Sequence, residues 1–243
     1  FSLSYLGFNT SIAPFDDVKI RQAIAHAIDK DKLVNVTLRG MAARADGILP
    51  PGMPGYSRGF QPLTYDPARA RQLVAESRYA GQLPTITFTA GSSGGAAPTN
   101  VLAIQEMIRQ NTGLNVEIQL VDIGAFYAGL NARRYGMFIT GWIADYPDPY
   151  DFLDILFHSN SSLNHGNYVN PQVDGLLERA RTERDDALRM RLYQDAEQIL
   201  LSDAAAIPLD YAREYWLVKP YVKGVQRPPL IMPWLVNVYI EGQ

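Results

Sequence analysis

A cluster of four aspartates holds the side chains that are most able to carry chemistry. These residues, within the segment ADYPDPYDFLD, are Asp145, Asp148, Asp151 and Asp154. Two carboxylates on opposite sides of a cleft could serve as a general acid and a general base. However, Pro147 and Pro149 indicate a turn, and an aspartate that precedes a helix usually caps it. We therefore interpret Asp148, Asp151 and Asp154 as turn and capping residues, and we consider Asp145 separately.

The three histidines are the next candidates for catalysis or metal binding. His158 and His165 lie in the segment HSNSSLNHGN and could share a ligand if this loop folds back. Their separation matches no common zinc-binding spacing, and His26 falls on a predicted helix. The chain contains no cysteine, which excludes disulfides, thiolate catalysis and iron–sulfur clusters. We therefore predict no metal site.

Motifs for nucleotide chemistry are missing as well. The glycine-rich residues 91–95 lack the Lys-Ser/Thr pair of a P-loop, and the chain has no G-x-G-x-x-G fingerprint. The net charge is −3, so nothing indicates a nucleic-acid partner. Arg179, Arg181 and Arg184 lie among acidic residues and are expected on a solvated helix face. We therefore expect a protein that is not an enzyme and uses no cofactor.

The segments that must position these residues alternate between predicted helices and strands. Apolar residues at helical spacing, with Asp16 or Asp17 and Asp66 as N-caps and Gly113 as a stop, predict helices over residues 15–30, 66–77, 101–113, 126–133, 173–180 and 188–200. Alternating patterns predict strands over residues 1–10, 85–90, 116–123, 137–142, 205–211, 215–218 and 237–240. Such alternation is typical of an α/β fold, a sheet with helices on its faces.

Five segments, in this order along the chain, resemble one family of proteins. They are YLGFNT with PFDDVKIRQAIAHAIDKDKLV, LPPGMPGY with YDPARARQLVAES, GWIADYPDPYDFL, NYVNPQVDGLLERA, and IPLDYAREYWLVKPYVKGV with NVYI. The chain resembles the peptide/nickel (oligopeptide/dipeptide) extracytoplasmic solute-binding proteins of ABC transporters, family 5. The resemblance implies an α/β lobe like those of type II periplasmic binding proteins, with a central mixed sheet flanked by helices on both faces.

The resemblance also implies how the chain is divided. Family members have two lobes, and residues 1–212 correspond to their second, C-terminal lobe. Residues 213–243 correspond to a C-terminal segment that returns to the N-terminal lobe. The chain starts at Phe1 without a methionine or a signal-peptide pattern. We therefore expect a processed or truncated product that lacks the N-terminal lobe.

One aspartate of this chain matches a ligand-binding position of the family. In peptide-binding members, the aspartate of the motif G-W-x-x-D receives the α-ammonium group of the ligand, and this position is Asp145 here. The resemblance thus implies a ligand site of Asp145 and Ala144 with Trp142 and Tyr146 as walls. Trp142 could equally be an ordinary core residue.

Two positions depart from the family pattern. Some peptide binders place a basic residue shortly before G-W to meet the ligand carboxylate, where this chain has MFIT. The family often has an aspartate where this chain has Gly136. Arg133 and Arg134 lie nearby but are expected on an exposed helix end. The length of the ligand and the partner of its carboxylate therefore stay open.

The resemblance implies a transport function outside the cytoplasm. A protein of this kind captures di- or oligopeptides in the periplasm or at the cell surface and delivers them to the membrane subunits of an ABC permease. Whether the full-length protein carries a lipid anchor stays open. Alternative hypotheses are a ligand-sensing lobe of a regulatory protein and a binder of a nickel chelate or an oligosaccharide. A hydrolase that uses Asp145 and Asp148 is a further alternative.

Overall fold

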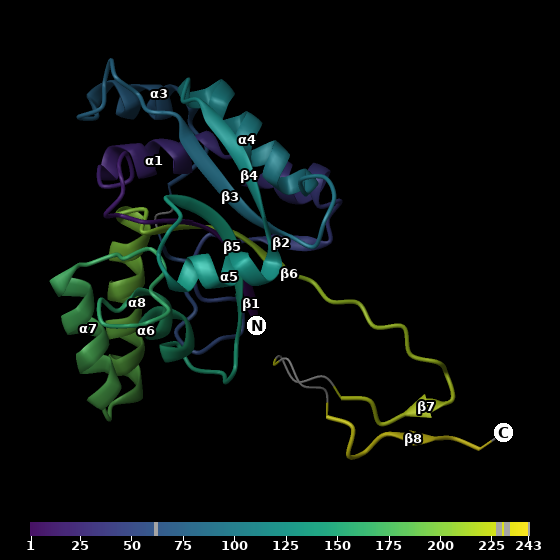
Figure 1. The fold of residues 1–243 in the computed structure, drawn as a ribbon. Coiled ribbons are helices and arrows are strands. Elements are labelled where there is room, and N and C mark those ends of the chain that lie inside the picture. Colours follow the sequence, from purple (N-terminus) through teal and green to yellow (C-terminus); the bar gives the residue numbers. More distant parts are fainter. Residues whose placement is uncertain (61–62, 227–229, 231–233, 243) are drawn as a thin grey trace.

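The computed structural model describes residues 1–60, 63–226, 230 and 234–242, and its centre is a six-stranded sheet (Figure 1). The strands are β1 (Ser2–Phe8), β2 (Ala42–Arg44), β3 (Ile86–Ser92), β4 (Val116–Asp122), β5 (Met137–Ile143) and β6 (Ala206–Ala212). They lie side by side in the order β2-β6-β1-β5-β3-β4. β1 is antiparallel to β5 and β6, whereas β3 is parallel to β4 and β5. The expected mixed sheet is confirmed.

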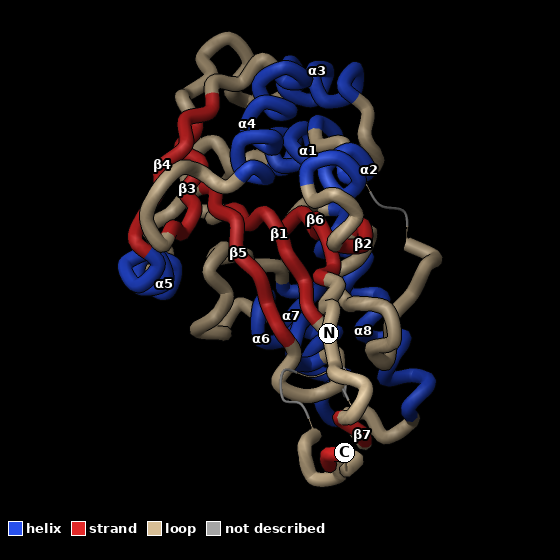
Figure 2. Tube along the Cα trace, turned by 90° about the vertical axis from the view of Figure 1, so that its right-hand side faces the viewer, coloured by secondary structure: helices blue, strands red, loops and turns tan. Residues whose placement is uncertain are grey.

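Helices cover both faces of the sheet, as predicted (Figure 2). One face carries α1 (Val18–Ala27), α3 (Pro67–Glu76) and α4 (Thr99–Thr112), next to the short α2 (Lys30–Lys32) and a π-helical turn (Leu33–Thr37). The other face carries α5 (Ile123–Asn131), α6 (Tyr150–Phe157), α7 (Pro171–Thr182) and α8 (Asp186–Ser202). Side chains of β1 alternate between the two cores: Leu6 and Phe8 join the first, Leu3 and Tyr5 the second. No helix within the described residues has the length and apolar character needed to cross a membrane.

Capping residues in the sequence explain where several helices begin or end. The side chain of Asp17 accepts a hydrogen bond from the N–H of Lys19 and starts α1. Asp66 does the same for α3, where Pro67 occupies the first turn. α4 ends at Gly113, whose φ of 77° is left-handed and favours a residue without a Cβ atom. The predictions for these helix ends are confirmed.

Two features around β4 differ from the prediction. α5 begins at Ile123 and not at Phe126, because Oδ1 of Asp122 accepts a hydrogen bond from the N–H of Gly124 and starts the helix directly after the strand. The predicted alternation over residues 116–123 places Leu120 on the same face as Val116, but Leu120 is exposed whereas Val116 is buried. The core beneath α4 includes the beginning of this edge strand and ends before Leu120.

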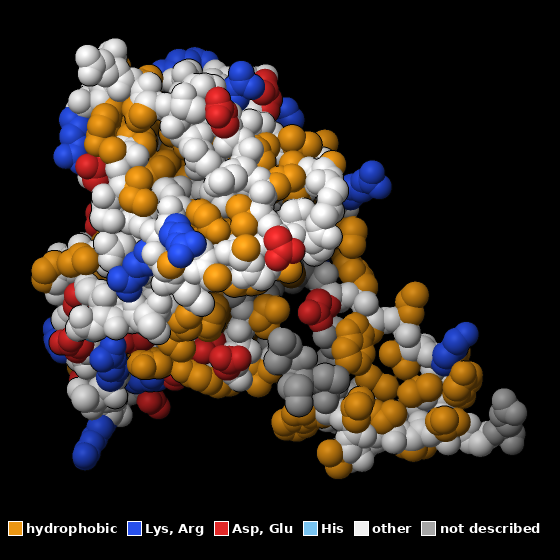
Figure 3. Space-filling view, viewed as in Figure 1, with side chains coloured by type: hydrophobic (Ala, Val, Ile, Leu, Met, Phe, Trp, Pro, Cys, Tyr) orange, Lys and Arg blue, Asp and Glu red, His pale blue; other side chains and the backbone are white. Residues whose placement is uncertain are grey.

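Beyond β6 the chain leaves the body of the molecule (Figure 1). Residues 213–242 contain a short hairpin of β7 (Val222–Lys223) and β8 (Tyr239–Ile240). The strand predicted over residues 215–218 is wrong, since this segment pairs with no described strand, and Leu217 is fully exposed. Hydrophobic side chains gather along this tail (Figure 3). The division of the chain at residue 212 stays a prediction.

Gly7 of β1 has a neighbour that leaves no room for a side chain. It lies opposite Phe138 of β5, and a Cβ atom at Gly7 would approach Cε2 of that buried ring to 2.3 Å. Over-packing of this kind costs about 1–3 kcal/mol. We therefore expect Gly7→Ala to lower the free energy of unfolding, measured by urea denaturation, by about 2 kcal/mol.

Gly175→Ala is the matched control for this change. Gly175 lies within α7, and no atom lies within 4 Å of the position that its Cβ would take. Alanine is also the better helix former, so this variant should be as stable as the unchanged protein or slightly more stable. A Gly7→Ala protein that matches Gly175→Ala in stability would contradict the packing argument.

Candidate ligand-binding site

Asp145 lies just beyond the carboxyl end of β5, on the loop that leads to α6. The parallel strands β3, β4 and β5 end at the same edge of the sheet, which is where open α/β sheets usually bind ligands. Ala144 is buried and its N–H donates to the carbonyl of Phe1 at 3.0 Å, whereas Asp145 is exposed. Within the described part of the chain, nothing pairs with the Asp145 carboxylate. This carboxylate is therefore available to a cationic group.

The neighbouring Asp151 is completely buried, and its side chain points back to this loop. Its Oδ2 accepts hydrogen bonds from the backbone N–H of Asp145 at 3.0 Å and from Nε1–H of Trp142 at 3.2 Å. Burial raises the pKa of Asp151 above its ordinary value. The interpretation of Asp151 as a capping residue is therefore wrong: it lies inside α6 and binds groups outside the helix.

The interpretation of Asp148 as a turn and capping residue is confirmed. Its Oδ1 accepts a hydrogen bond from the N–H of Tyr150, the first residue of α6. Both carboxylate oxygens also pair with the guanidinium of Arg189 from α8, at 2.8 and 2.9 Å. Although burial alone would raise it, the hydrogen bonds from Arg189 hold the pKa of Asp148 below its ordinary value. This pair fastens the loop that carries Asp145 to α8.

Asp154 is buried inside α6 and pairs with Arg181 of α7. Nε of Arg181 donates to Oδ1 of Asp154 at 2.7 Å, and NH2 donates to the same oxygen. Burial still raises the pKa of Asp154 above its ordinary value. Two expectations are thereby corrected: Asp154 is not a turn residue, and Arg181 is not merely part of a solvated face. The pair joins α6 to α7.

The two expected wall residues differ in their surroundings. Trp142 is half-buried and packs against the core beneath α6, while its indole N–H is held by Asp151. Tyr146 is 40% exposed. Burial of its hydroxyl and the nearby carboxylates raise the pKa of Tyr146 to about 12, so that the hydroxyl keeps its proton and can donate. Ile143 is exposed next to them and adds apolar surface beside Asp145.

The histidines are not brought together. Nδ1 of His26 lies 2.6 Å from the carbonyl of Thr64. Nε2 of His158 lies 3.2 Å from Glu178, and Nε2 of His165 lies 3.0 Å from Asn131. The described residues include no cluster of three His, Cys, Asp or Glu side chains that could hold a metal ion. His158 and His165 therefore serve different local contacts.

Arg133 and Arg134 lie far from Asp145, at the other end of β5. Arg133 is not on an exposed helix end, as was expected: it is half-buried, and its guanidinium donates to Asn167 and to the carbonyl of Ser161. Arg134 is exposed. Because β5 rises about 3.3 Å per residue, roughly 20 Å separate these arginines from the Asp145 loop. A ligand that touches Asp145 would have to be about six extended residues long to reach either arginine.

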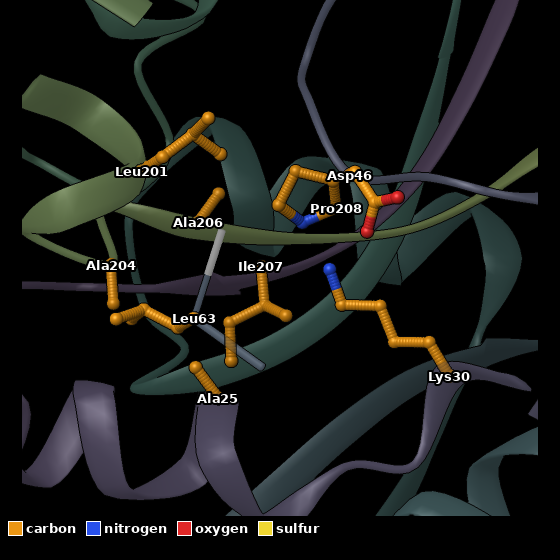
Figure 4. A pocket seen from close by; sticks show the side chains of 9 residues that line it. All are labelled: Ala25, Lys30, Asp46, Leu63, Leu201, Ala204, Ala206, Ile207 and Pro208. Atoms are coloured by element: carbon orange, nitrogen blue, oxygen red, sulfur yellow. The ribbon is translucent and has the colours of Figure 1, made fainter. Parts of the chain in front are cut away.

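Two hollows among the described residues lie away from Asp145. Figure 4 shows a cavity of about 10 Å³ beside β6, lined by Lys30, Asp46 and apolar side chains. This volume holds about one water molecule. Nζ of Lys30 donates to the carbonyl of Ala45, and burial lowers the pKa of Lys30 to about 8. A larger hollow of about 260 Å³ lies between residues 12–15 and Arg134, near the start of β5. The surface around Asp145 is thus separate from both.

Residues 91–95, GSSGG, also fit the G-x-S-x-G pattern of hydrolases, with Ser93 in the place of the nucleophile. Ser93 is exposed in the loop between β3 and α4. A hydrolase needs a base beside this hydroxyl. The three histidines contact Thr64, Glu178 and Asn131 instead. Among the described residues, Ser93 therefore has no histidine hydrogen-bonded to it as a base.

The mixed six-stranded sheet with helices on both faces is a fold of the type II periplasmic binding proteins. The sequence model "Bacterial extracellular solute-binding proteins, family 5 Middle" matches residues 1–164, and the chain belongs to this family. It is 28% identical to the dipeptide-binding protein of Escherichia coli K12, over 99% of this chain and 46% of that protein. It is 32% identical to the glutathione-binding protein GsiB of Salmonella choleraesuis, over 84% and 41%. The chain thus spans about half the length of these relatives.

Solved structures resemble this lobe over nearly its whole length. DppA from Helicobacter pylori, in complex with the peptide STSA, superposes with a TM-score of 0.86 and 26% identity, over 99% of this chain and 47% of that chain. The dipeptide-binding protein from Pseudoalteromonas, in complex with Met-Leu, superposes with a TM-score of 0.82 and 27% identity, over 98% and 48%. The family is thus one of solute-binding proteins, and the expected fold is confirmed.

Proposed function

We propose that this chain is the part of an ABC-transporter substrate-binding protein that receives the amino end of a peptide. The observation that carries the proposal is the exposed Asp145 carboxylate, unpaired among the described residues, at the carboxyl end of β5. A charge-assisted contact between this carboxylate and an α-ammonium group would contribute about 1.5–3 kcal/mol. Relatives that are named for dipeptides or bound to STSA and Met-Leu support peptides as the ligand class.

The ligand would be enclosed between this lobe and an N-terminal lobe of the same protein. The start of β1 and the end of β6 lie together, since the N–H of Ala212 donates to Oγ of Ser2 at 3.2 Å. The carbonyl of Phe1 accepts from Ala144, so this junction adjoins the Asp145 loop. The apolar tail, residues 213–242, would lie against the N-terminal lobe.

Closure of the two lobes over the ligand would produce the form that the permease recognises. A ligand that contacts both lobes stabilises the closed state over the open one, which gives the permease subunits a signal that the protein is loaded. The family description as extracellular supports a location in the periplasm or at the cell surface. The partners of this chain would accordingly be a peptide, the N-terminal lobe and the permease.

Native mass spectrometry of the full-length gene product with a pool of short peptides tests this function. We expect complexes with di- to pentapeptides, retained at low micromolar peptide concentrations and absent when the protein is denatured. Retention of nickel chelates or oligosaccharides from parallel pools, with no peptide retained, would replace the peptide assignment. Shortening of the pooled peptides would instead indicate a hydrolase.

A further inference from the structure

We propose that Asp151 is the positioning residue of the ligand site. It holds Asp145 and Trp142 in place by hydrogen bonds and does not touch the ligand. This inference rests on the proposed function, because it assigns the residue that holds Asp145 in place. The carboxylate of Asp151 is fully buried, and its Oδ2 accepts from both the backbone of Asp145 and the indole of Trp142. One oxygen atom therefore sets the position of the ammonium acceptor and of its aromatic wall together.

The hydrogen bonds of Asp151 are not needed by the helix in which it lies. The N–H groups of Asp151, Phe152 and Leu153 donate to backbone carbonyls of Asp148 and Pro149. The remaining N–H at the start of α6, that of Tyr150, donates to the side chain of Asp148. The first turn is thus complete without the Asp151 carboxylate. The hydrogen bonds of the Asp151 side chain therefore connect α6 to Asp145 and Trp142 and do not cap α6 itself.

Burial of this carboxylate has a cost that local structure does not explain. Oδ1 of Asp151 is buried without a hydrogen-bond partner among the described residues. The charges of Asp145 and Asp148, which also raise the pKa of Asp151, are negative, and Arg189 is engaged by Asp148. Arg181 on α7 is engaged by Asp154. A buried, unpaired carboxylate is unfavourable for folding. Its benefit lies in the rigid placement of Asp145, because preorganised groups bind ligands without the loss of their own freedom.

The test compares Asp151→Ala with Asp151→Asn in the full-length protein, by calorimetric titration with a peptide from the pool. Asparagine keeps an oxygen acceptor where alanine has none. We expect alanine to weaken binding at least about tenfold, because both hydrogen bonds to this side chain are lost. We expect asparagine to stay within about threefold of the unchanged protein, because its oxygen can still accept both. Alanine within threefold of the unchanged protein, or asparagine as weak as alanine, would overturn the proposal.

Asp154→Asn is the matched control, since Asp154 is the other buried aspartate of α6 and contacts Arg181 instead of the site. Asp154→Asn should change the free energy of unfolding of the protein and leave its peptide affinity unchanged. A second readout needs no ligand: the indole N–H resonance of Trp142, assigned through Trp142→Phe, should move upfield in Asp151→Ala and stay in place in Asp154→Asn. An unmoved resonance would overturn the proposal.

The proposed function and this inference can fail separately. If the unchanged full-length protein retains no peptide, the function fails. If it binds peptides and loses them in Asp145→Asn, while Asp151→Ala binds normally, only the positioning role of Asp151 fails.

Discussion

Asp145→Asn should weaken peptide binding by the full-length protein about 10- to 100-fold, as the loss of a charge-assisted contact of about 1.5–3 kcal/mol requires. The asparagine side chain has nearly the same shape but no charge, and no described group pairs with Asp145 in the free lobe. The stability of the lobe should therefore hardly change. Calorimetric titration gives the affinity, and urea denaturation of the same samples gives the stability.

Asp122→Asn is the control for this loss of charge. Asp122 ends β4 at the same edge of the sheet, is exposed, and caps α5 through Oδ1. Asparagine caps helices as well as aspartate does, so this variant keeps the fold and removes one negative charge. Its peptide affinity should stay within about twofold of the unchanged protein, as expected for a screened surface charge. Equal losses in both variants would mean that general electrostatic attraction, and not a contact at Asp145, explains the binding.

Glu197→Gln should remove most of a pH dependence of stability. Glu197 of α8 is fully buried, and its Oε1 accepts from the N–H groups of Ile48 and Leu49 at 2.5 and 3.0 Å. Its Oε2 has no partner among the described residues. Burial raises the pKa of Glu197 to about 8 from an ordinary 4.5. The folded protein therefore keeps the proton of this carboxyl group at neutral pH.

The direction of the effect follows from the proton that the two states bind. Between about pH 4.5 and pH 8 the unfolded chain has released this proton and the native state has not. The free energy of unfolding contributed by Glu197 therefore falls as the pH rises through this range, by a few kcal/mol in total at about 1.4 kcal/mol per pKa unit. Glutamine does not ionise, and its oxygen can still accept from residues 48 and 49.

Urea denaturation at pH 5 and pH 8.5 measures this difference. The stability of the unchanged protein should fall more steeply with pH than that of Glu197→Gln, since other buried carboxyl groups contribute equally to both. Glu106→Gln, at an exposed position on α4, should keep the original slope. Parallel slopes for the unchanged protein and Glu197→Gln would show that the carboxyl group at position 197 is already ionised in the folded state.

The elements that the sequence predicted well depend on neighbours along the chain. Asp17, Asp66 and Gly113 act within one turn of a helix, and their roles are visible in the printed residues. The strand over residues 215–218 was predicted wrongly because a strand needs a second strand to pair with, and composition cannot reveal that no described strand pairs with this segment. The exposure of Leu120 could not be predicted for a related reason, since it depends on where the core beneath α4 ends.

The candidate site was predictable only in part. The motif around Asp145 indicates a ligand site through the family resemblance alone, and the role of Asp145 stays a prediction. The role of Asp151 could not be predicted, because an aspartate shortly after Pro149 fits a helix cap. Its contacts with Trp142 and Asp145 depend on how α6 packs against the end of β5. The same limit applies to Asp154 with Arg181 and to Glu197 with Ile48, which are distant in the sequence. Buried carboxylates of this kind can be assigned only once the tertiary contacts are known.

The proposed contact between Asp145 and the ligand ammonium is tested most directly by a double change in protein and ligand. A peptide that binds the full-length protein and its N-acetylated form, which has no ammonium group, are each titrated into the unchanged protein and Asp145→Asn. We predict that acetylation weakens binding to the unchanged protein about 10- to 100-fold but binding to Asp145→Asn no more than about threefold, since the two changes remove the same contact. Equal losses on acetylation in both proteins would contradict the assignment of Asp145 as the ammonium acceptor.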